Sequence, residues 1–334
     1  MPHSIMKAAT SKTKAQNGLL RDEVKDHLME STKVSSIIEA MSNSGGFEAK
    51  NFSYGVDILR RMLNENSCTK FLSFVAATIS TGMRGIVRNM VKDNMFNCIV
   101  TTCGALDHDI ARTYKPYYAG DFRMNDSALL KKRIHRLGNI LVPESSYGSV
   151  IEKKVQSCLQ DLYDNQEKRE FAAYEIIDFI GSTLDESSFL YWAHKHNVSV
   201  IVPGIVDGAV GSQIWLFQQR HKDFKVDLMR DQTKMSDYVY DAMRTGALMI
   251  GGGISKHHTL WWNQFRGGLD YAVYITSASE WDGSLSGALV AEAISWGKVT
   301  EKAKQTTIHG EATVLLPFIY AALKENLKTQ DETR

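Results

Sequence analysis

Lys298 lies in a sequence context that suits covalent chemistry. It directly follows Trp296 and Gly297, so a bulky apolar ring stands close to its amine along the chain. Partial burial beside such a ring disfavours the charged form of a lysine, and the neutral amine is then nucleophilic enough to form an imine. The alternative is a solvated surface lysine, which is the usual state of this residue. The Trp-Gly-Lys spacing alone leaves both interpretations open.

Acidic and hydroxyl side chains upstream of this lysine suit a ligand that carries ammonium groups. Asp282 and Glu292 provide carboxylates, and Ser284 and Ser286 provide hydroxyls. The ring of Trp296 offers a face for cation–π contact. The pattern therefore predicts a site for an amine ligand.

The segment 251–258, GGGISKHH, is a glycine-rich turn between an apolar run and a helical stretch. Glycines allow backbone N–H groups to approach a pyrophosphate, and the start of a helix adds the positive end of a dipole. Because the segment is not G-x-G-x-x-G, the standard Rossmann fingerprint is absent, and a plain turn remains the alternative to dinucleotide binding. His257 and His258 offer a general base, since a neutral imidazole titrates near physiological pH; alternatively, one caps the turn and the other packs.

Short apolar runs that alternate with longer helical stretches predict how these residues are positioned. Runs buried on both faces, with helices between them, are typical of a parallel sheet in an α/β protein. The sequence therefore predicts a three-layer α/β sandwich. The clearest predicted strands are 97–102, 198–203, 247–250 and 271–276, and apolar spacing predicts amphipathic helices around 34–41 and 56–63.

Each predicted strand is followed by small or polar residues. In parallel sheets, ligands bind beyond the carboxyl ends of the strands, where the loops meet. We therefore expect a cleft that admits an extended, phosphate-bearing ligand. The turns expected to line it are 101–104, 207–208, 251–253 and 276–278.

The overall composition excludes several classes of protein. The chain has 334 residues with 39 Lys and Arg against 38 Asp and Glu, so it lacks a basic field for a polyanion, and nucleic acid is not expected as a partner. No apolar run approaches the roughly 18 residues that span a bilayer, and residues 1–16 lack the apolar segment of a secretory signal. We therefore expect a soluble, cytoplasmic protein without a membrane partner.

No linker divides the chain, so we expect a flexible tail over residues 1–30 and a single domain over residues 31–330. The four cysteines form no C-x-x-C pair, and no histidine cluster lies near them at the spacing of zinc ligands. Neither a metal site nor a disulfide framework is expected.

Several long motifs strongly resemble the deoxyhypusine synthase family, in a form similar to its archaeal branch. The resemblance covers roughly residues 50 to 325. The motifs are TISTGMR at 78–84, TTCGALDHD at 101–109, RLGNILVP at 136–143, PGIVDGAVG at 203–211, GGGISKHH at 251–258, GLDYAVYI at 268–275, EWDGSLSG at 280–287 and EAISWGK at 292–298.

The resemblance implies a Rossmann-like NAD-binding fold and an NAD-dependent transfer of the 4-aminobutyl group of spermidine to one lysine of the translation initiation factor 5A precursor. NAD would take hydride from the carbon next to the secondary amine of spermidine. The lysine that matches Lys298 would then displace 1,3-diaminopropane and hold the four-carbon unit as an imine. The factor's lysine would take over that unit, and NADH would reduce the new imine. The family also implies a homotetramer whose active sites are shared between chains, and no metal.

The same matching implies roles for individual residues. Lys298 and His257 fall on the catalytic positions, with His257 transferring a proton near spermidine. The positions implied for the substrate are Asp107, His108, Asp282, Gly283, Ser284, Glu292 and Trp296. Those implied for the cofactor are Ser80, Thr102, Cys103, Gly104, Asp207, Gly252, Ser277, Ala278, Glu311 and Ala312.

The chain departs from the eukaryotic pattern of the family at acidic positions. His108, Ser212 and Leu285 stand where that pattern has acids for the substrate, and Glu311 replaces an Asp on the cofactor side. Fewer carboxylates would neutralise a polyamine less well. Either neighbouring acids such as Asp107 and Asp109 compensate, or the donor differs.

Two alternative functions stay open. The aminobutyl unit could pass to a free diamine such as putrescine, as in homospermidine synthesis, or the chain could be a non-catalytic subunit that binds NAD and activates a paralogue. Retention of Lys298, Trp296 and His257 argues against the second alternative, because a scaffold has no chemical use for a nucleophilic lysine.

Overall fold

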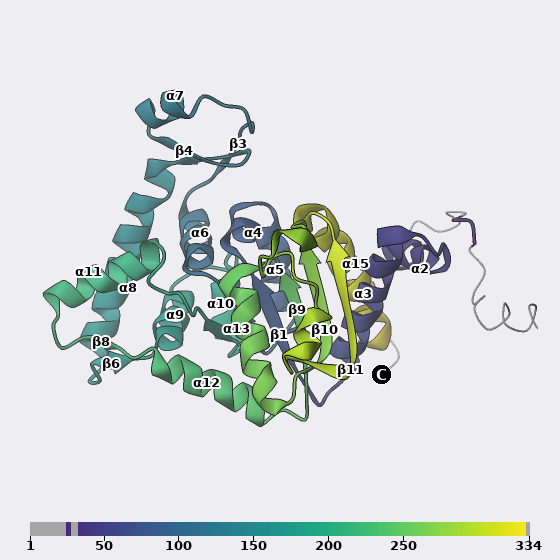
Figure 1. The fold of residues 1–334 in the computed structure, drawn as a ribbon. Helices are drawn as coiled ribbons and strands as arrows, with labels where there is room; N and C mark the ends of the chain where they lie inside the picture. Colours follow the sequence, from purple (N-terminus) through teal and green to yellow (C-terminus); the bar gives the residue numbers. More distant parts are fainter. Residues whose placement is uncertain (1–24, 28–32, 332–334) are drawn as a thin grey trace, which may run out of the picture.

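A six-stranded sheet forms the centre of the molecule (Figure 1). The computed structural model of the chain describes residues 25–27 and 33–331, so the tail expected over 1–30 lies almost wholly outside the described residues. Every neighbouring pair of strands in this sheet is parallel. The strand order is β11-β10-β9-β1-β2-β7, with β1 at Cys68–Phe74, β2 at Cys98–Val100, β7 at Ser199–Ile201, β9 at Arg244–Ile250, β10 at Leu269–Thr276 and β11 at Val299–His309.

Both faces of the sheet are buried. Successive side chains of a strand point to opposite faces, and here they enter two different apolar cores. In β1, Leu72 and Phe74 belong to one apolar cluster and Phe71 to another. In β9, Leu248 packs into the first cluster and Met249 into the second. The three-layer α/β sandwich predicted from the sequence is confirmed.

Helices cover the two faces unequally. The larger core includes residues of α2 (Val34–Asn43), α3 (Phe47–Asn64), α5 (Met83–Lys92), α6 (Cys103–Tyr114), α8 (Gly148–Asn165), α9 (Ala173–Ser182), α10 (Phe189–Lys195), α11 (Ala209–Arg220) and α15 (Ala312–Asp331). Of these helices, α3, α9 and α10 pack directly on strands of the sheet. The other core includes residues of α12 (Met229–Tyr240), α13 (Gly253–Asn263) and the short α14 (Glu292–Ser295). The helices predicted around residues 34–41 and 56–63 correspond to α2 and α3.

Two small sheets were not predicted. Strands β3 (Tyr118–Ala119), β5 (Ile140–Pro143) and β4 (Ile134–Leu137) form an antiparallel sheet that projects from the main body together with α7 (Asp126–Lys131) (Figure 1). Strands β6 (Glu170–Phe171) and β8 (Lys225–Val226) form a two-stranded parallel pair. Among the described residues, no helix is long and apolar enough to cross a membrane. The four cysteines are buried free thiols.

The carboxyl ends of the main strands meet along one edge of the sheet. Phe74 of β1 pairs with Ile250 of β9, which pairs with Ile275 of β10. The chain order reverses between β1 and β9, because β2 and β7 follow on one side of β1 and β10 and β11 on the other. Ligands of α/β proteins bind in the crevice at such a switch point.

Candidate active site

The turns beyond the carboxyl ends of the strands bring together most of the residues predicted to contact the cofactor. The short helix α4 (Ala76–Ser80) follows β1, α6 follows β2, α13 follows β9 and α15 follows β11. Asp207 lies in the turn between β7 and α11. The predicted positions on this edge are Ser80, Thr102, Cys103, Gly104, Asp207, Gly252, Ser277, Ala278, Glu311 and Ala312.

The start of α6 has the properties of an anion-binding site. Thr102 occupies the N-cap position without making a side-chain cap, and no acidic residue occurs in the first turn of the helix. The hydroxyl of Thr102 is buried and has no hydrogen-bond partner in the described part of the chain. Free N–H groups at a helix start attract phosphate, and an unpaired buried hydroxyl is costly without a ligand. These residues fit a dinucleotide.

The glycine turn before α13 has no room for side chains. Gly251 has a positive φ of 73°, which favours glycine. A Cβ on Gly252 would lie 2.2 Å from the hydroxyl oxygen of Ser286. The backbone of this turn is therefore packed tightly against the segment that carries Ser286.

Lys298 lies in a cluster of aromatic rings on the outer face of α13. Its Nζ is 5.2 Å from the ring centroid of Trp296 and 5.8 Å from that of Trp261. His257 stacks on Trp261, with ring centroids 5.9 Å apart and an interplanar angle of 23°. The cluster therefore places the amine and the imidazole, the two groups predicted to be catalytic, beside the same indole.

His257 is set up to be a neutral base. Desolvation lowers the pKa of its imidazole, and the positive charge of Lys298 lowers it further. His258, one residue on, points the other way, is buried, and has its pKa lowered to about 4, chiefly by burial. Of the two histidines, the exposed His257 is therefore the one that can exchange a proton with a ligand.

Trp261 is a member of the cluster that the sequence analysis did not identify. It lies one helical turn after His257, at the i+4 spacing that places two side chains on one helix face. That spacing was available in the sequence. The contact of Trp261 with Lys298 could not be predicted from the sequence, because the two residues come from different elements.

The predicted amine ligands are solvent-accessible in the single chain. Asp282 accepts a hydrogen bond of 2.7 Å from the backbone N–H of Ser284, and hydrogen bonding to Ser284 lowers the pKa of its carboxyl group. Gly283 between them has a φ of 71°, which turns the chain. Glu292, at the start of α14, is exposed. Both carboxylates are therefore available to an ammonium group.

The structure argues against Asp107 as a substrate ligand. Its carboxylate accepts hydrogen bonds from the N–H groups of Ala209 at 2.9 Å and Val210 at 2.8 Å and from the hydroxyl of Tyr147 at 2.9 Å. These bonds cap the start of α11. The carboxylate is therefore occupied by groups of its own chain.

His108 is also unsuited to replace an acid. Its Nδ1 lies 2.9 Å from the hydroxyl of Tyr117, and its ring packs against Tyr147. Burial, with a smaller contribution from Arg112, lowers the pKa of this imidazole to about 4. His108 is therefore neutral near physiological pH and neither attracts nor repels an ammonium group strongly.

Asp109 has a structural role. It is fully buried, and its carboxylate lies 2.6 Å from Nε of Arg84 and accepts a hydrogen bond of 2.5 Å from the hydroxyl of Ser188. Arg84 is 8% exposed. The pair ties α6 to α5, so Asp109 cannot compensate for the missing acids.

We predict that Asp109→Asn lowers stability. Breaking a buried ion pair leaves the partner charge uncompensated, which costs about 3–5 kcal/mol. Urea denaturation should show this loss, whereas Asp126→Asn, which breaks the exposed pair with Arg136, should change stability far less. Equally small changes in both variants would contradict the structural role of Asp109.

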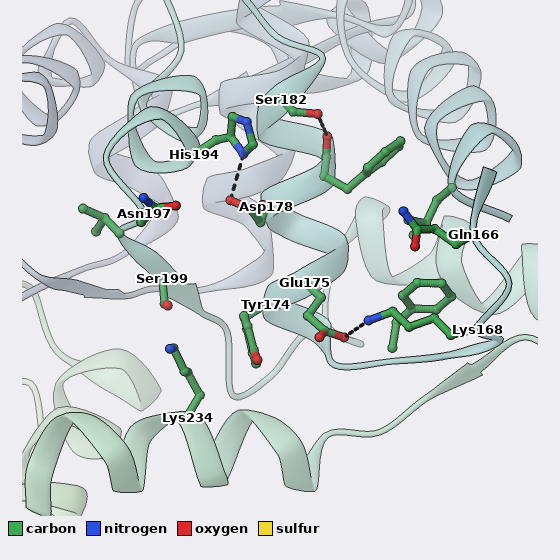
Figure 2. Close-up of a pocket in the computed structure, with 14 residues that line it drawn as sticks. Gln166, Lys168, Tyr174, Glu175, Asp178, Ser182, His194, Asn197, Ser199 and Lys234 are labelled. Atoms are coloured by element: carbon green, nitrogen blue, oxygen red, sulfur yellow. Dashed lines mark hydrogen bonds and ion pairs between the residues drawn. The ribbon is translucent and has the colours of Figure 1, made fainter. Parts of the chain in front are cut away.

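A cavity of about 370 Å³ lies away from these residues (Figure 2). It opens beside Ser199 at the amino end of β7 and contains none of the predicted site residues. Its charges are largely paired, with His194 3.0 Å from Asp178 and Lys168 3.1 Å from Glu175. This cavity is therefore not the candidate active site.

Comparisons with known proteins identify the family to which the chain belongs. The family model described as deoxyhypusine synthase matches residues 36–323. The chain is 52% identical over 308 residues to a probable deoxyhypusine synthase of Picrophilus torridus, covering 92% of this chain and 98% of the relative. It is 50% identical over 291 residues to a probable deoxyhypusine synthase of Thermoplasma acidophilum, covering 87% of this chain and 93% of the relative.

The fold has a counterpart among solved structures. The crystal structure of a putative deoxyhypusine synthase from Entamoeba histolytica matches with a TM-score of 0.59 at 20% identity, covering 90% of this chain and 95% of that chain. The likeness to archaeal relatives predicted from the sequence is confirmed. The chain belongs to the deoxyhypusine synthase family, and it is an enzyme of the transferase class.

Proposed function

We propose that this enzyme transfers the 4-aminobutyl group of spermidine to a specific lysine of the translation initiation factor 5A precursor, with NAD as cofactor. The observation that carries the proposal is the cluster of Lys298, Trp296, Trp261 and His257. It combines an amine nucleophile, a neutral base and two ring faces for a cationic substrate. Membership of the family supports the same reaction.

In this proposal, the amine of Lys298 attacks the oxidised carbon of the substrate, and 1,3-diaminopropane leaves as the enzyme imine forms. His257 takes up and returns the proton that this exchange requires, because its lowered pKa keeps it neutral. Trp296 and Trp261 flank the amine and offer their faces to the substrate cation. The factor's lysine then displaces Lys298 from the four-carbon unit.

The turns at the carboxyl edge would hold the cofactor. When bound, NAD supplies a hydride acceptor for the carbon next to the secondary amine of spermidine and returns the hydride to the final imine. The unpaired hydroxyl of Thr102 and the uncapped start of α6 would hold its phosphates, with Gly252 on the neighbouring turn after β9. Ser80, Asp207, Ser277, Ala278, Glu311 and Ala312 surround this position on neighbouring turns.

A second copy of the chain would complete the site. Lys298 directly precedes β11, and its carbonyl accepts a hydrogen bond from Leu269 at the amino end of β10. The proposed cofactor turns lie at the opposite, carboxyl end of these strands. The lysine cluster is open to solvent in one chain, with Trp296 66% and Trp261 43% exposed. Exposed aromatic residues are enriched in subunit interfaces, so this surface supports a site shared between two chains.

We predict a homotetramer with each active site lined by two chains. Burial of Trp296, Trp261 and the neighbouring Phe265 would remove their exposed rings from water. Light scattering during size-exclusion chromatography would measure the assembly at micromolar concentration. A monomer that retains full activity would contradict the prediction.

Mass spectrometry of the products tests the function itself. The enzyme would be incubated with NAD and spermidine, together with either the purified factor precursor or putrescine. We expect a 4-aminobutyl addition on one lysine of the factor. Homospermidine without modified factor would favour the diamine acceptor, and no product with either acceptor would favour a non-catalytic, NAD-binding subunit.

A further inference from the structure

A buried lysine of α13 has no role in the chemistry described above. Lys256 is 1% exposed and lies on the buried side of α13, whereas His257 and Trp261 of the aromatic cluster are exposed. Its Nζ donates hydrogen bonds to the backbone carbonyl oxygens of Leu285 at 2.8 Å and Ala288 at 2.7 Å. It also lies 3.5 Å from the ring centroid of Tyr274. The direct contacts of its ammonium group are therefore with two carbonyl groups and a ring face.

The same segment is held by two side chains of β10. The hydroxyl of Tyr274 donates to the carbonyl oxygen of Ser286 at 2.6 Å, and the hydroxyl of Thr276 donates to the same oxygen at 2.8 Å. Four hydrogen bonds from one helix and one strand, to the carbonyl oxygens of Leu285, Ser286 and Ala288, thus fix the backbone of residues 285–288. We call this arrangement the 285–288 clamp.

The clamped segment has little freedom to move. A Cβ on Gly287 would lie 1.9 Å from the carbonyl oxygen of Ser279, and a Cβ on Gly252 would lie 2.5 Å from the Cα of Ser286. The segment therefore sits directly on the glycine turn before α13. The position of residues 285–288 therefore depends on Ser279 and on the turn that holds Gly252.

Burial of a lysine without a carboxylate in contact is unusual and needs a reason. Burial lowers the pKa of Lys256 to about 8, and the more distant charge of Glu292 opposes this shift. Hydrogen bonds from an ammonium group to carbonyl oxygens are strengthened by the charge, and the ring of Tyr274 adds cation–π attraction. These contacts are aimed at one short segment of chain, which points to a positioning role.

The segment joins the two acids that remain for an amine substrate. Asp282 and Ser284 precede it, and Glu292 follows it at the start of α14. Ser284 is linked to it directly, because its hydroxyl accepts a hydrogen bond of 3.2 Å from the N–H of Gly287. Displacement of residues 285–288 would therefore move both carboxylates relative to Lys298.

We propose that Lys256 is a positioning residue that fixes the 285–288 segment and thereby sets the places of Asp282 and Glu292 for a polyamine substrate. The inference rests on the proposed function for the identity of that substrate. Lys256 does not act as a second nucleophile, because its buried Nζ is engaged by two carbonyl groups. Its effect reaches the substrate through the segment that it holds.

The test compares Lys256→Met with wild-type enzyme and with Lys302→Met, a control at an exposed lysine of β11. Loss of a charge-assisted hydrogen bond should weaken spermidine binding at saturating NAD by about tenfold or more. The dissociation constant for NAD should change much less than that for spermidine, because the segment packs on only one of the proposed cofactor turns, the one that holds Gly252. Isothermal titration would give both constants, and the control should match wild type.

Hydrogen–deuterium exchange of the free enzyme gives a readout that needs no substrate. Lys256→Met should speed exchange in peptides that cover residues 285–291 while leaving β1 and β9 protected. Tyr274→Phe, which removes one bond to Ser286 and keeps the ring, should shift exchange and spermidine affinity in the same direction by a smaller factor. If Lys256→Met does not fold, the exchange rate and spermidine affinity of Tyr274→Phe test the proposal.

Unchanged exchange and unchanged spermidine affinity in both variants would overturn the proposal. Equal loss of spermidine and NAD binding would also overturn it, since that result indicates a general structural defect. A third outcome separates the two proposals. If Lys256→Met speeds exchange at 285–291 but the wild-type enzyme makes no deoxyhypusine, the proposed function is contradicted, whereas the role of Lys256 in holding this segment is supported.

Discussion

Lys298→Ala yields an enzyme that folds and binds NAD but forms no deoxyhypusine. Removal of the nucleophile deletes the covalent step, and the side chain is only half-buried, so its loss leaves no large cavity. We expect activity to fall to the background of the assay, while the thermal unfolding midpoint and the NAD dissociation constant stay close to those of wild type. Product formation would be followed by mass spectrometry of the factor.

Lys302→Ala is the matched control for this variant. Lys302 is an exposed lysine of β11, the strand that Lys298 directly precedes, and it lies outside the aromatic cluster. It should retain wild-type activity. Substantial product from Lys298→Ala would show that another group carries the four-carbon unit.

We expect Glu292→Gln to raise the spermidine requirement by at least about tenfold, because truncating one partner of a desolvated charge pair costs about 2–5 kcal/mol and each ~1.4 kcal/mol is tenfold in an equilibrium constant. Asp107 and Asp109 are occupied within the chain, so the amine depends on Glu292 and Asp282. Glu292 is exposed in one chain, and the neighbouring chain of the proposed tetramer would desolvate it and strengthen its attraction for an ammonium group. NAD affinity should hardly change.

Spermidine titrations at saturating NAD would measure this effect, with Glu301→Gln as the control at an exposed glutamate of β11. If Glu292→Gln and Glu301→Gln both keep the wild-type requirement, the amine is anchored elsewhere. Asp282 would then be the next candidate, because its carboxylate is accessible.

The strands that the sequence predicted are those with continuous apolar runs. β10 is buried over almost its whole length, and its sequence is accordingly an almost continuous apolar run. β11 was missed because it is an edge strand with many exposed polar side chains, so its sequence lacks the apolar run. β1 was missed although it lies in the middle of the sheet, because Thr69 and Lys70 interrupt its apolar pattern.

The candidate site was predicted mainly by the family resemblance, which gave Lys298, His257 and Trp296. The roles of Asp107 and Lys256 could not be predicted in this way. Asp107 caps a helix that begins at Ala209, and Lys256 binds carbonyl groups near Leu285. Such contacts between residues far apart in the chain depend on the tertiary fold and leave no local pattern in the sequence.

The most direct test of the account is to locate the covalent intermediate. Wild-type enzyme would be incubated with NAD and spermidine without the factor, reduced with borohydride, digested and mapped by mass spectrometry. We predict a four-carbon amine adduct on the peptide that contains Lys298, absent when spermidine or NAD is left out. An adduct on Lys256 or on any other lysine, with Lys298 unmodified, would contradict the account.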